Sequence, residues 1–143
     1  IGADVIVGFP GETNSDFLET YDFLKTLNIS YLHVFSFSDR IDTKAYNMLN
    51  KVDMLEKNNR SKMLRILSTK KTRKFYTENK DFLHSVLFES ENKNGFIYGY
   101  TSNYIRVKTY WDPTLSNKVL QVYIQSIGAD GIANVKVKNE IYA

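Results

Sequence analysis

The stretch DVIVGFPGET, residues 4–13, sets the fold of the first half of the chain. Its apolar start predicts a buried strand over residues 3–7, because a strand this hydrophobic usually lies inside a sheet. The Phe-Pro-Gly-Glu segment predicts a turn, and Thr13, followed three residues later by Asp16, is typical of a helix N-cap. On spacing alone, a tight β-α turn with a good cap is the simplest interpretation.

The residues that follow predict a parallel β-α-β unit and then a long helix. Apolar spacing extends the first helix to about Leu27, and the aromatic, β-branched run over 31–37 predicts the second strand. This order of elements favours an α/β arrangement with parallel strands. A short helix is expected over 43–50. A long helix is expected over 53–79, with Glu56 completing a capping pair at its start.

From residue 83 the hydrophobic period changes to two, which indicates strands. Asn94-Gly95 predicts a hairpin turn, and the segment 128–131 predicts another. Five short strands over about 60 residues predict a small closed β-barrel of the OB or SH3 type. The predicted strands are 84–90, 96–100, 104–109, 119–127 and 132–138. We therefore expect an α/β domain over 1–80 and a β-barrel domain over 81–143.

The composition excludes several kinds of site. The chain has no Cys and two His, His33 and His84, which leaves no thiolate and too few imidazoles for a zinc site or a Ser-His-Asp triad. We expect both histidines to be structural. No apolar run reaches the about 18 residues of a membrane helix, and no signal-peptide pattern is present. We therefore expect no metal ligand in this chain and no membrane partner. The expected location, cytoplasmic, and the expectation of no catalytic residue in this chain come with the family resemblance described below.

Positive charge concentrates in one segment of the chain. Residues 60–80 hold eight Lys or Arg and one Glu, whereas 1–59 are net negative and 81–143 are balanced. A cationic stripe on a helix can meet an RNA phosphate backbone, although a solvated helix face is the usual explanation of such a run. The stripe comprises Lys62, Arg65, Lys70, Lys71, Arg73 and Lys74, of which the last four are candidate RNA contacts.

The DVIVGFPGET run closely resembles the late-barrel segment of radical S-adenosylmethionine (SAM) enzymes, especially the methylthiotransferases. A second stretch, residues 35–45, resembles the family pattern F-x-Y-S-x-R-x-G-T-x-A, with Phe37 for the usual Tyr and Asp42 for the usual Gly. The positions that match are Arg40, Thr43 and Ala45. The resemblance implies that the SAM site is walled by Gly8, Phe9, Pro10 and Gly11, and that Arg40 contacts SAM or substrate.

Two polar residues of these segments have simpler interpretations. The guanidinium of Arg40 suits a carboxylate or phosphate, but it can instead form a surface ion pair with Asp39 or Asp42. Glu12 can be a ligand, or an acid that the helix dipole favours in the first turn. Both alternatives stay open at this point.

The segment GFIYGYTSNYIRV, residues 95–107, resembles the core of the TRAM domain, a small RNA-binding β-barrel of tRNA-modifying enzymes. Its form is most similar to enzymes that methylthiolate threonylcarbamoyl-adenosine in tRNA. Aromatic side chains can stack on unpaired bases, although a Tyr on alternating strand positions is more often half-buried, and we expect about half of the aromatic residues here to be structural, since strand side chains alternate. The candidate RNA contacts are Tyr100, Asn103, Tyr104 and Arg106, while Trp111 either stacks on a base or covers the barrel end.

The resemblance implies a longer parent enzyme that contains this chain as its C-terminal part. The fold implied is the last βαβ portion of a radical SAM partial TIM-type barrel, followed by a TRAM barrel. The implied reaction adds a methylthio group to C2 of threonylcarbamoyl-adenosine beside the anticodon. It uses SAM and two [4Fe-4S] clusters held by Cys residues that precede residue 1. The implied partners are the tRNA anticodon stem-loop and the preceding domains of the same protein, and the chain alone would be inactive.

Two other interpretations remain. The parent could methylthiolate a ribosomal protein, in which case the barrel would bind protein. The chain could also be a non-catalytic RNA-binding module. A C-x-x-x-C-x-x-C motif upstream of residue 1 would separate a radical SAM enzyme from such a module.

Overall fold

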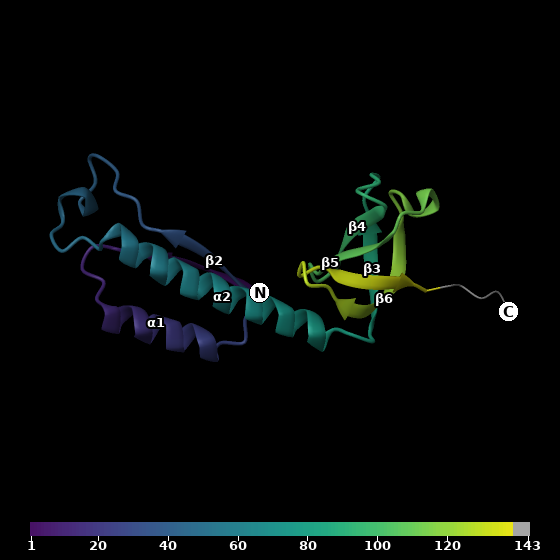
Figure 1. Ribbon diagram of the computed structural model, residues 1–143, viewed down its shortest axis with the longest axis horizontal. Helices are drawn as coiled ribbons and strands as arrows, with labels where there is room; N and C mark the ends of the chain where they lie inside the picture. The colour runs from purple at the N-terminus through teal and green to yellow at the C-terminus, as the bar shows by residue number, and fades with distance from the viewer. Residues whose placement is uncertain (139–143) are drawn as a thin grey trace. The chain divides into compact units, whose positions relative to one another are not determined.

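The computed structural model describes residues 1–138, in which a β-α-β segment is followed by a long helix and five strands (Figure 1). Two compact units divide the chain, Ile1–Thr72 and one that begins at Arg73, so the long helix contributes to both. The elements are β1 Gly2–Val7, α1 Asn14–Thr26, β2 Tyr31–Ser36, η1 Ala45–Asn47, α2 Met54–Glu78, β3 Leu83–Phe88, β4 Phe96–Thr101, β5 Arg106–Tyr110, η2 Pro113–Leu115, β6 Val119–Ile127 and β7 Ala133–Val137.

The first unit is a parallel strand pair with two helices packed on one face. β1 pairs with β2 in parallel register from Gly2–Tyr31 to Val7–Ser36, which confirms the predicted β-α-β unit. Side chains from both strands and both helices form one hydrophobic cluster, Val7, Phe17, Leu24, Leu32, Leu64 and Leu67. A TIM-type barrel needs further strands, so the radical SAM barrel stays a prediction.

The other face of this strand pair is exposed. Ile6 is 59% exposed and Phe35 is 54% exposed, because within the described chain no element covers this side. The prediction that residues 3–7 form a buried strand is therefore wrong for alternate positions. The short helix predicted over 43–50 is present only as the 3-10 turn η1, Ala45–Asn47.

The start of α1 has the capping arrangement that the sequence predicts. The Thr13 hydroxyl accepts a hydrogen bond from the Asp16 N–H at 3.1 Å, and the Asp16 carboxylate accepts one from the Thr13 N–H at 2.9 Å. This reciprocal pair satisfies two backbone donors that the helix itself cannot. The turn before it is thereby tied to the helix.

The second unit contains a closed barrel with strand order β3-β4-β5-β7-β6, as predicted from the alternating pattern. The expected TRAM-like domain extends to residues 139–143, which lie outside the described residues. The barrel is filled mainly by Val, Ile and Phe side chains, and one residue of α2, Tyr76, enters the same core. The Tyr76 hydroxyl accepts a hydrogen bond from the Arg106 N–H at 3.0 Å, which anchors the end of α2 to β5.

The aromatic residues of β4 all lie on the outer face of the barrel. The inner positions of this strand are Ile97, Gly99 and Thr101, each buried, whereas Phe96, Tyr98 and Tyr100 alternate with them and remain at least partly exposed. None of the β4 aromatic side chains therefore enters the barrel core, and the prediction that about half of the aromatic residues are structural stays a prediction. At the inward position of Gly99 even a Cβ atom would lie 2.5 Å from the Leu87 carbonyl oxygen of β3.

Candidate cofactor wall and nucleic-acid interface

The turn after β1 is held by an ion pair between the partly buried Glu12 and the buried Arg60. Gly8, at φ 82, donates its N–H to the Glu12 carboxylate at 3.0 Å. The Arg60 guanidinium, from α2, donates to the same carboxylate oxygen at 2.7 Å and to the Glu12 carbonyl oxygen at 3.0 Å. Arg60 is 4% exposed and also bonds to Glu56 at 3.3 Å. Glu12 is thus occupied within the protein.

This role of Arg60 was not predicted from the sequence, in which Arg60 is one of the eight Lys and Arg residues of the basic segment 60–80. The local pattern that pointed to an ion pair of Arg60 was weak. Glu56 lies four residues before it, a spacing at which ion pairs are common on helices. The contact with Glu12 spans 48 positions of the chain, so no local pattern could reveal it.

A pocket of about 370 Å³ lies at the carboxyl end of β2, where α/β sheets usually place ligands. Its lining is mostly apolar and hydroxylic, and its one cationic group is the Arg40 guanidinium. The lining residues are Ile6, Phe35, Ser36, Phe37, Ser38, Arg40, Thr43 and Ala45.

Of the five residues predicted to form the SAM site, one lines this pocket, one contacts a lining residue, and three lie outside the lining. Arg40 lines it, and among residues 1–138 its guanidinium has no hydrogen-bond or ion-pair partner; Asp39 instead pairs with Lys51 at 2.9 Å. Phe9 makes an edge contact at 5.1 Å with Phe37, a lining residue. The remaining turn residues are not part of the lining: Gly8, the buried Pro10, and Gly11, whose N–H donates to Asn50.

The four basic candidates of α2 have different surroundings. Lys71 donates to the Leu27 carbonyl oxygen at 2.8 Å, just past the C-terminus of α1, where a cation is favoured. Arg73 donates to the Gly128 carbonyl oxygen at 3.3 Å. Lys74 forms an exposed pair with Glu78 at 3.7 Å. Lys70 is exposed and makes no ion pair with any residue that the structure describes, as is also true of Lys62 and Arg65.

Three of the four barrel candidates come together on the outer face of β4 and β5. The Arg106 guanidinium lies 4.6 Å from the centre of the Tyr100 ring, and the Tyr104 ring lies 5.2 Å from that of Tyr100. Tyr104 is 78% exposed and is held at φ 70, which is unusual for a residue with a large side chain. Arg106 also donates to both carboxylate oxygens of Glu89, at 3.1 and 3.0 Å.

The fourth candidate, Asn103, is directed elsewhere. Its amide nitrogen donates to the Asn79 side-chain oxygen at 3.1 Å, and its own oxygen accepts from the Thr101 hydroxyl at 2.5 Å. Both ends of the amide therefore stabilise the loop between β4 and β5. The loop in turn presents Tyr104.

The same outer face continues along both strands as a series that we call the aromatic–cation row. Lys108 lies 4.6 Å from the centre of the Phe96 ring, which stacks on Tyr110 at 5.4 Å. A hydrogen bond from Lys108 to Asp130 raises the pKa of the ammonium and lowers the pKa of the carboxyl group. The row consists of Phe96, Tyr98, Tyr100, Tyr104, Arg106, Lys108 and Tyr110. The alternation along β4 and its pairing with β5 in a hairpin could have added four residues to the candidate RNA contacts predicted from the sequence: Phe96, Tyr98, Lys108 and Tyr110.

Residues 1–138 contain no cluster of three or more His, Asp or Glu side chains that could hold a metal ion. Neither of the helices in this range is long and apolar enough to cross a membrane. Both histidines have local partners. His33 contacts Asp4 at 3.2 Å, and His84 contacts the Asn79 carbonyl oxygen at 2.9 Å.

Comparison with known proteins identifies the family, although no family model matches the chain. The threonylcarbamoyladenosine tRNA methylthiotransferase MtaB of Aquifex aeolicus is 44% identical over 108 residues, which cover 76% of this chain and 25% of the relative. The tRNA-2-methylthio-N(6)-dimethylallyladenosine synthase of Endomicrobium trichonymphae is 35% identical over 135 residues, 91% of this chain and 32% of the relative. This chain belongs to the methylthiotransferase family.

The family includes relatives with a different named substrate. The ribosomal protein uS12 methylthiotransferase RimO of Alkaliphilus oremlandii is 32% identical over 112 residues, 78% of this chain and 24% of the relative. The chain therefore spans about a quarter to a third of the length of these methylthiotransferases.

Proposed function

We propose that this chain is the part of a radical SAM tRNA methylthiotransferase that contributes to the SAM site and binds the tRNA. The domain assignment goes with it: residues 1–80 belong to the radical SAM barrel and 81–143 to a TRAM domain. The observation that carries the RNA-binding role is the aromatic–cation row on the outside of β4 and β5. The parent enzyme acts in the cytoplasm on the anticodon stem-loop.

The pocket beside Arg40 fits part of a SAM site. SAM carries a carboxylate and an adenine ring, and the pocket is lined by the Arg40 guanidinium, which is unpaired among residues 1–138, and by the aromatic rings of Phe35 and Phe37. Arg40 would bind the carboxylate, and Phe9, through its contact with Phe37, would help to exclude water from this end. SAM bound here beside a reduced cluster would supply the radical chemistry of the reaction. The two [4Fe-4S] clusters require Cys ligands, which this chain does not have.

The aromatic–cation row has the chemistry of a single-stranded RNA surface. Exposed aromatic rings stack on unpaired bases, and that stacking tolerates any base. Tyr104 and Tyr100 offer such rings, and Arg106 keeps a positive guanidinium against them even though Glu89 offsets its charge. Lys70, together with Lys62 and Arg65, supplies exposed cations for phosphate contacts, whereas Lys71 and Arg73 act mainly within the protein.

The substrate we favour is threonylcarbamoyl-adenosine. The support is the 44% identity to the Aquifex aeolicus relative, which is named for that nucleoside, against 35% and 32% for the relatives with other named substrates. The dimethylallyladenosine and ribosomal-protein substrates are the competing possibilities.

Nucleoside mass spectrometry of bulk tRNA from a strain without the gene tests the proposal. We expect the methylthio form of threonylcarbamoyl-adenosine to disappear and its unthiolated precursor to accumulate, with both restored by the intact gene. A gene with Tyr104→Leu should restore the product only in part, since stacking is worth about 1–3 kcal/mol per base. Loss of methylthio-dimethylallyladenosine, or of the uS12 modification, in place of this nucleoside would contradict the substrate assignment.

A further inference from the structure

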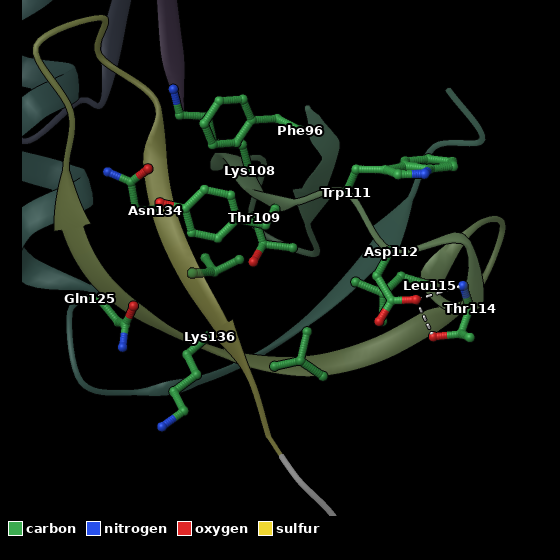
Figure 2. A pocket seen from close by; sticks show the side chains of 13 residues that line it. Phe96, Lys108, Thr109, Trp111, Asp112, Thr114, Leu115, Gln125, Asn134 and Lys136 are labelled. Carbon is green, nitrogen blue, oxygen red and sulfur yellow. Dashed lines mark hydrogen bonds between the residues drawn. The ribbon is translucent and has the colours of Figure 1, made fainter. Parts of the chain in front are cut away.

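A pocket of about 910 Å³ opens on the barrel surface between β5 and β7 (Figure 2). It lies where these two strands pair over only two positions, Val107–Ala133 and Lys108–Asn134. Its volume lies within the range of about 300–1,000 Å³ that is typical of small-ligand sites. It shares Phe96, Lys108 and Tyr110 with the aromatic–cation row, and its other lining residues lie outside the row.

Aromatic side chains form one part of this pocket. The Phe96 and Tyr110 rings stack at 5.4 Å with an interplanar angle of 20°. Tyr110 is nevertheless 79% exposed, so its ring offers a flat surface for a further planar group. Trp111 also lines the pocket, and its backbone N–H is fixed to the Gly95 carbonyl oxygen at 2.8 Å.

Two side-chain amides form another part. The strand β6 has a bulge between Ile124 and Ser126, and Gln125 is the extra residue there. Bulges commonly redirect a side chain towards a site, and the Gln125 amide has no hydrogen-bond partner within residues 1–138. Asn134 donates to the Ser126 hydroxyl at 3.2 Å, which leaves its oxygen available as an acceptor. Such amides match the donor and acceptor edges of a nucleobase.

The charges around the pocket are arranged asymmetrically. Figure 2 shows Gln125 and Lys136 on one side and Asp112 with Thr114 on the opposite side. Lys136 is exposed and forms no ion pair with a described residue, whereas Lys108 is held by Asp130 at 2.8 Å. The Asp112 carboxylate accepts hydrogen bonds from Thr114 and retains its negative charge. An anionic group is therefore favoured beside Lys136.

We propose that this pocket binds one unpaired nucleotide of the RNA, with its base stacked on Tyr110, the base edge bonded to Gln125 and Asn134, and its phosphate beside Lys136. The inference rests on the RNA-binding role proposed above and adds a second, base-contacting site to it. The two sites share one strand pair, so a single strand that lies along the aromatic–cation row can enter the pocket at Phe96.

Tryptophan fluorescence gives a direct test, because Trp111 is the one Trp of the chain and lines the pocket. The full chain is titrated with the oligonucleotide hexauridylate, and we expect saturable quenching. Tyr110→Leu should weaken binding by at least about fivefold, through lost stacking. Gln125→Ala should weaken it about threefold or more, through lost hydrogen bonds. Gln121→Ala, an exposed Gln of the same strand outside the pocket, should leave affinity unchanged.

Charge is tested separately through salt dependence. Lys136→Gln should lower the slope of log affinity against log salt by about 0.7, the value for one phosphate contact to a single strand. Lys138→Gln, an exposed Lys outside the pocket, is the matched control and should change the slope less. Circular dichroism of each variant verifies that the barrel is folded.

Three results would overturn the inference. If Tyr104→Leu weakens binding while Tyr110→Leu and Gln125→Ala do not, RNA binding by the row stands and the pocket assignment fails. If the unaltered chain binds no hexauridylate by fluorescence or by filter retention, both proposals fail. If adenosine monophosphate or uridine monophosphate binds as tightly as the hexanucleotide, the pocket is a site for a free nucleotide.

Discussion

Arg60 lies within the most basic segment of the chain, yet its guanidinium is buried and faces inward. It donates to Glu12 at 2.7 Å and packs 5.7 Å from the centre of the Phe17 ring. A buried guanidinium of this kind is a structural element of the turn after β1, because the carboxylate that it meets is itself only 16% exposed. The number of Lys and Arg residues in a segment therefore does not show how many of their charged groups are exposed and able to contact RNA.

Arg60→Met should destabilise the first unit by about 3 kcal/mol, because the substitution leaves the mostly buried Glu12 carboxylate without its cationic partner. Urea denaturation followed by circular dichroism measures the change. Arg65→Met, at an exposed position of the same helix, should stay within about 0.5 kcal/mol of the unaltered chain. Adding Glu12→Gln to Arg60→Met should recover part of the loss. Equal effects of the two arginine substitutions would show that the ion pair has no structural role.

Gly99 is required by the close approach of β4 to β3. A Cβ at this position would lie 2.5 Å from the Leu87 carbonyl oxygen and 2.7 Å from the Val86 Cγ1 atom. Because one of these neighbours is backbone, the strands must move to relieve the overlap. We expect Gly99→Ala to destabilise the barrel by about 1–3 kcal/mol in thermal or urea unfolding.

Gly95→Asn is the control for that substitution. A Cβ at Gly95 would meet no atom within 4 Å, and Asn tolerates the positive φ of this turn better than other residues. Its effect should stay below about 1 kcal/mol. A Gly99→Ala variant as stable as Gly95→Asn would show that the strand spacing adjusts freely.

At the scale of elements, helix α1 is fixed at both ends by side chains. The reciprocal Thr13–Asp16 pair closes its N-terminus, and at its other end Lys71 donates to the Leu27 carbonyl oxygen. Further along α2, Thr72 donates to the Ser30 carbonyl oxygen at 3.1 Å. The polar residues on this part of α2 thus hold the connection between α1 and β2.

The N-cap of α1 should make stability depend on pH. The hydrogen bond from the Thr13 N–H, and then the interaction with the Thr13 side chain, lower the pKa of Asp16 below its ordinary value of 3.8. The folded state therefore binds this proton less readily than the unfolded state, and the contribution is complete above the ordinary pKa and is lost as pH falls through the lowered one. Asp16→Asn should be less stable than the unaltered chain at pH 6, and the two should converge near pH 2.

Urea midpoints measured across that range check this expectation. Asp22→Asn, at an exposed site of α1 that has no hydrogen bond to any described side chain, serves as the control and should parallel the unaltered chain. A constant difference between Asp16→Asn and the unaltered chain at all pH values would mean that the cap does not depend on the carboxylate charge.

For the whole molecule, the two hydrophobic clusters are built from separate sets of residues. One comprises side chains from β1, β2, α1 and α2, and the other comprises the barrel strands with Tyr76. Each unit carries its own candidate site: the pocket beside Arg40 in the first, and the aromatic–cation row with the nucleotide pocket in the second. We therefore assign the contribution to the SAM site to the first unit and RNA binding to the second, because each unit has its own hydrophobic core and its own candidate site.

We predict that the 143-residue chain alone holds no iron–sulfur cluster and has no methylthiotransferase activity. The physical reason is the absence of Cys, since thiolates are the ligands of such clusters. Anaerobic incubation with iron and sulfide, followed by desalting, iron analysis and absorbance near the visible charge-transfer bands, measures this directly. Stoichiometric iron that survives desalting, or any methylthiolated tRNA product, would refute the prediction. RNA binding by the same preparation serves as the control for folding.

The sequence by itself determined the features that depend on local order. Period-two alternation, the Asn94–Gly95 turn and five short strands predicted the closed barrel, and the Thr13–Asp16 spacing predicted the helix cap. The barrel strands were located to within a few residues, because each one carries its own alternating pattern.

Only the tertiary structure decided which polar and aromatic groups are free. Arg60 meets Glu12 across 48 positions, and Asn103 meets Asn79 across 24, so their use within the protein is invisible to local patterns. Alternation shows that two faces exist in β4 but not which one closes on the core, and the aromatic face proved to be the outer one. The bulge that frees Gln125 likewise depends on the register between β6 and β7, which barrel closure sets.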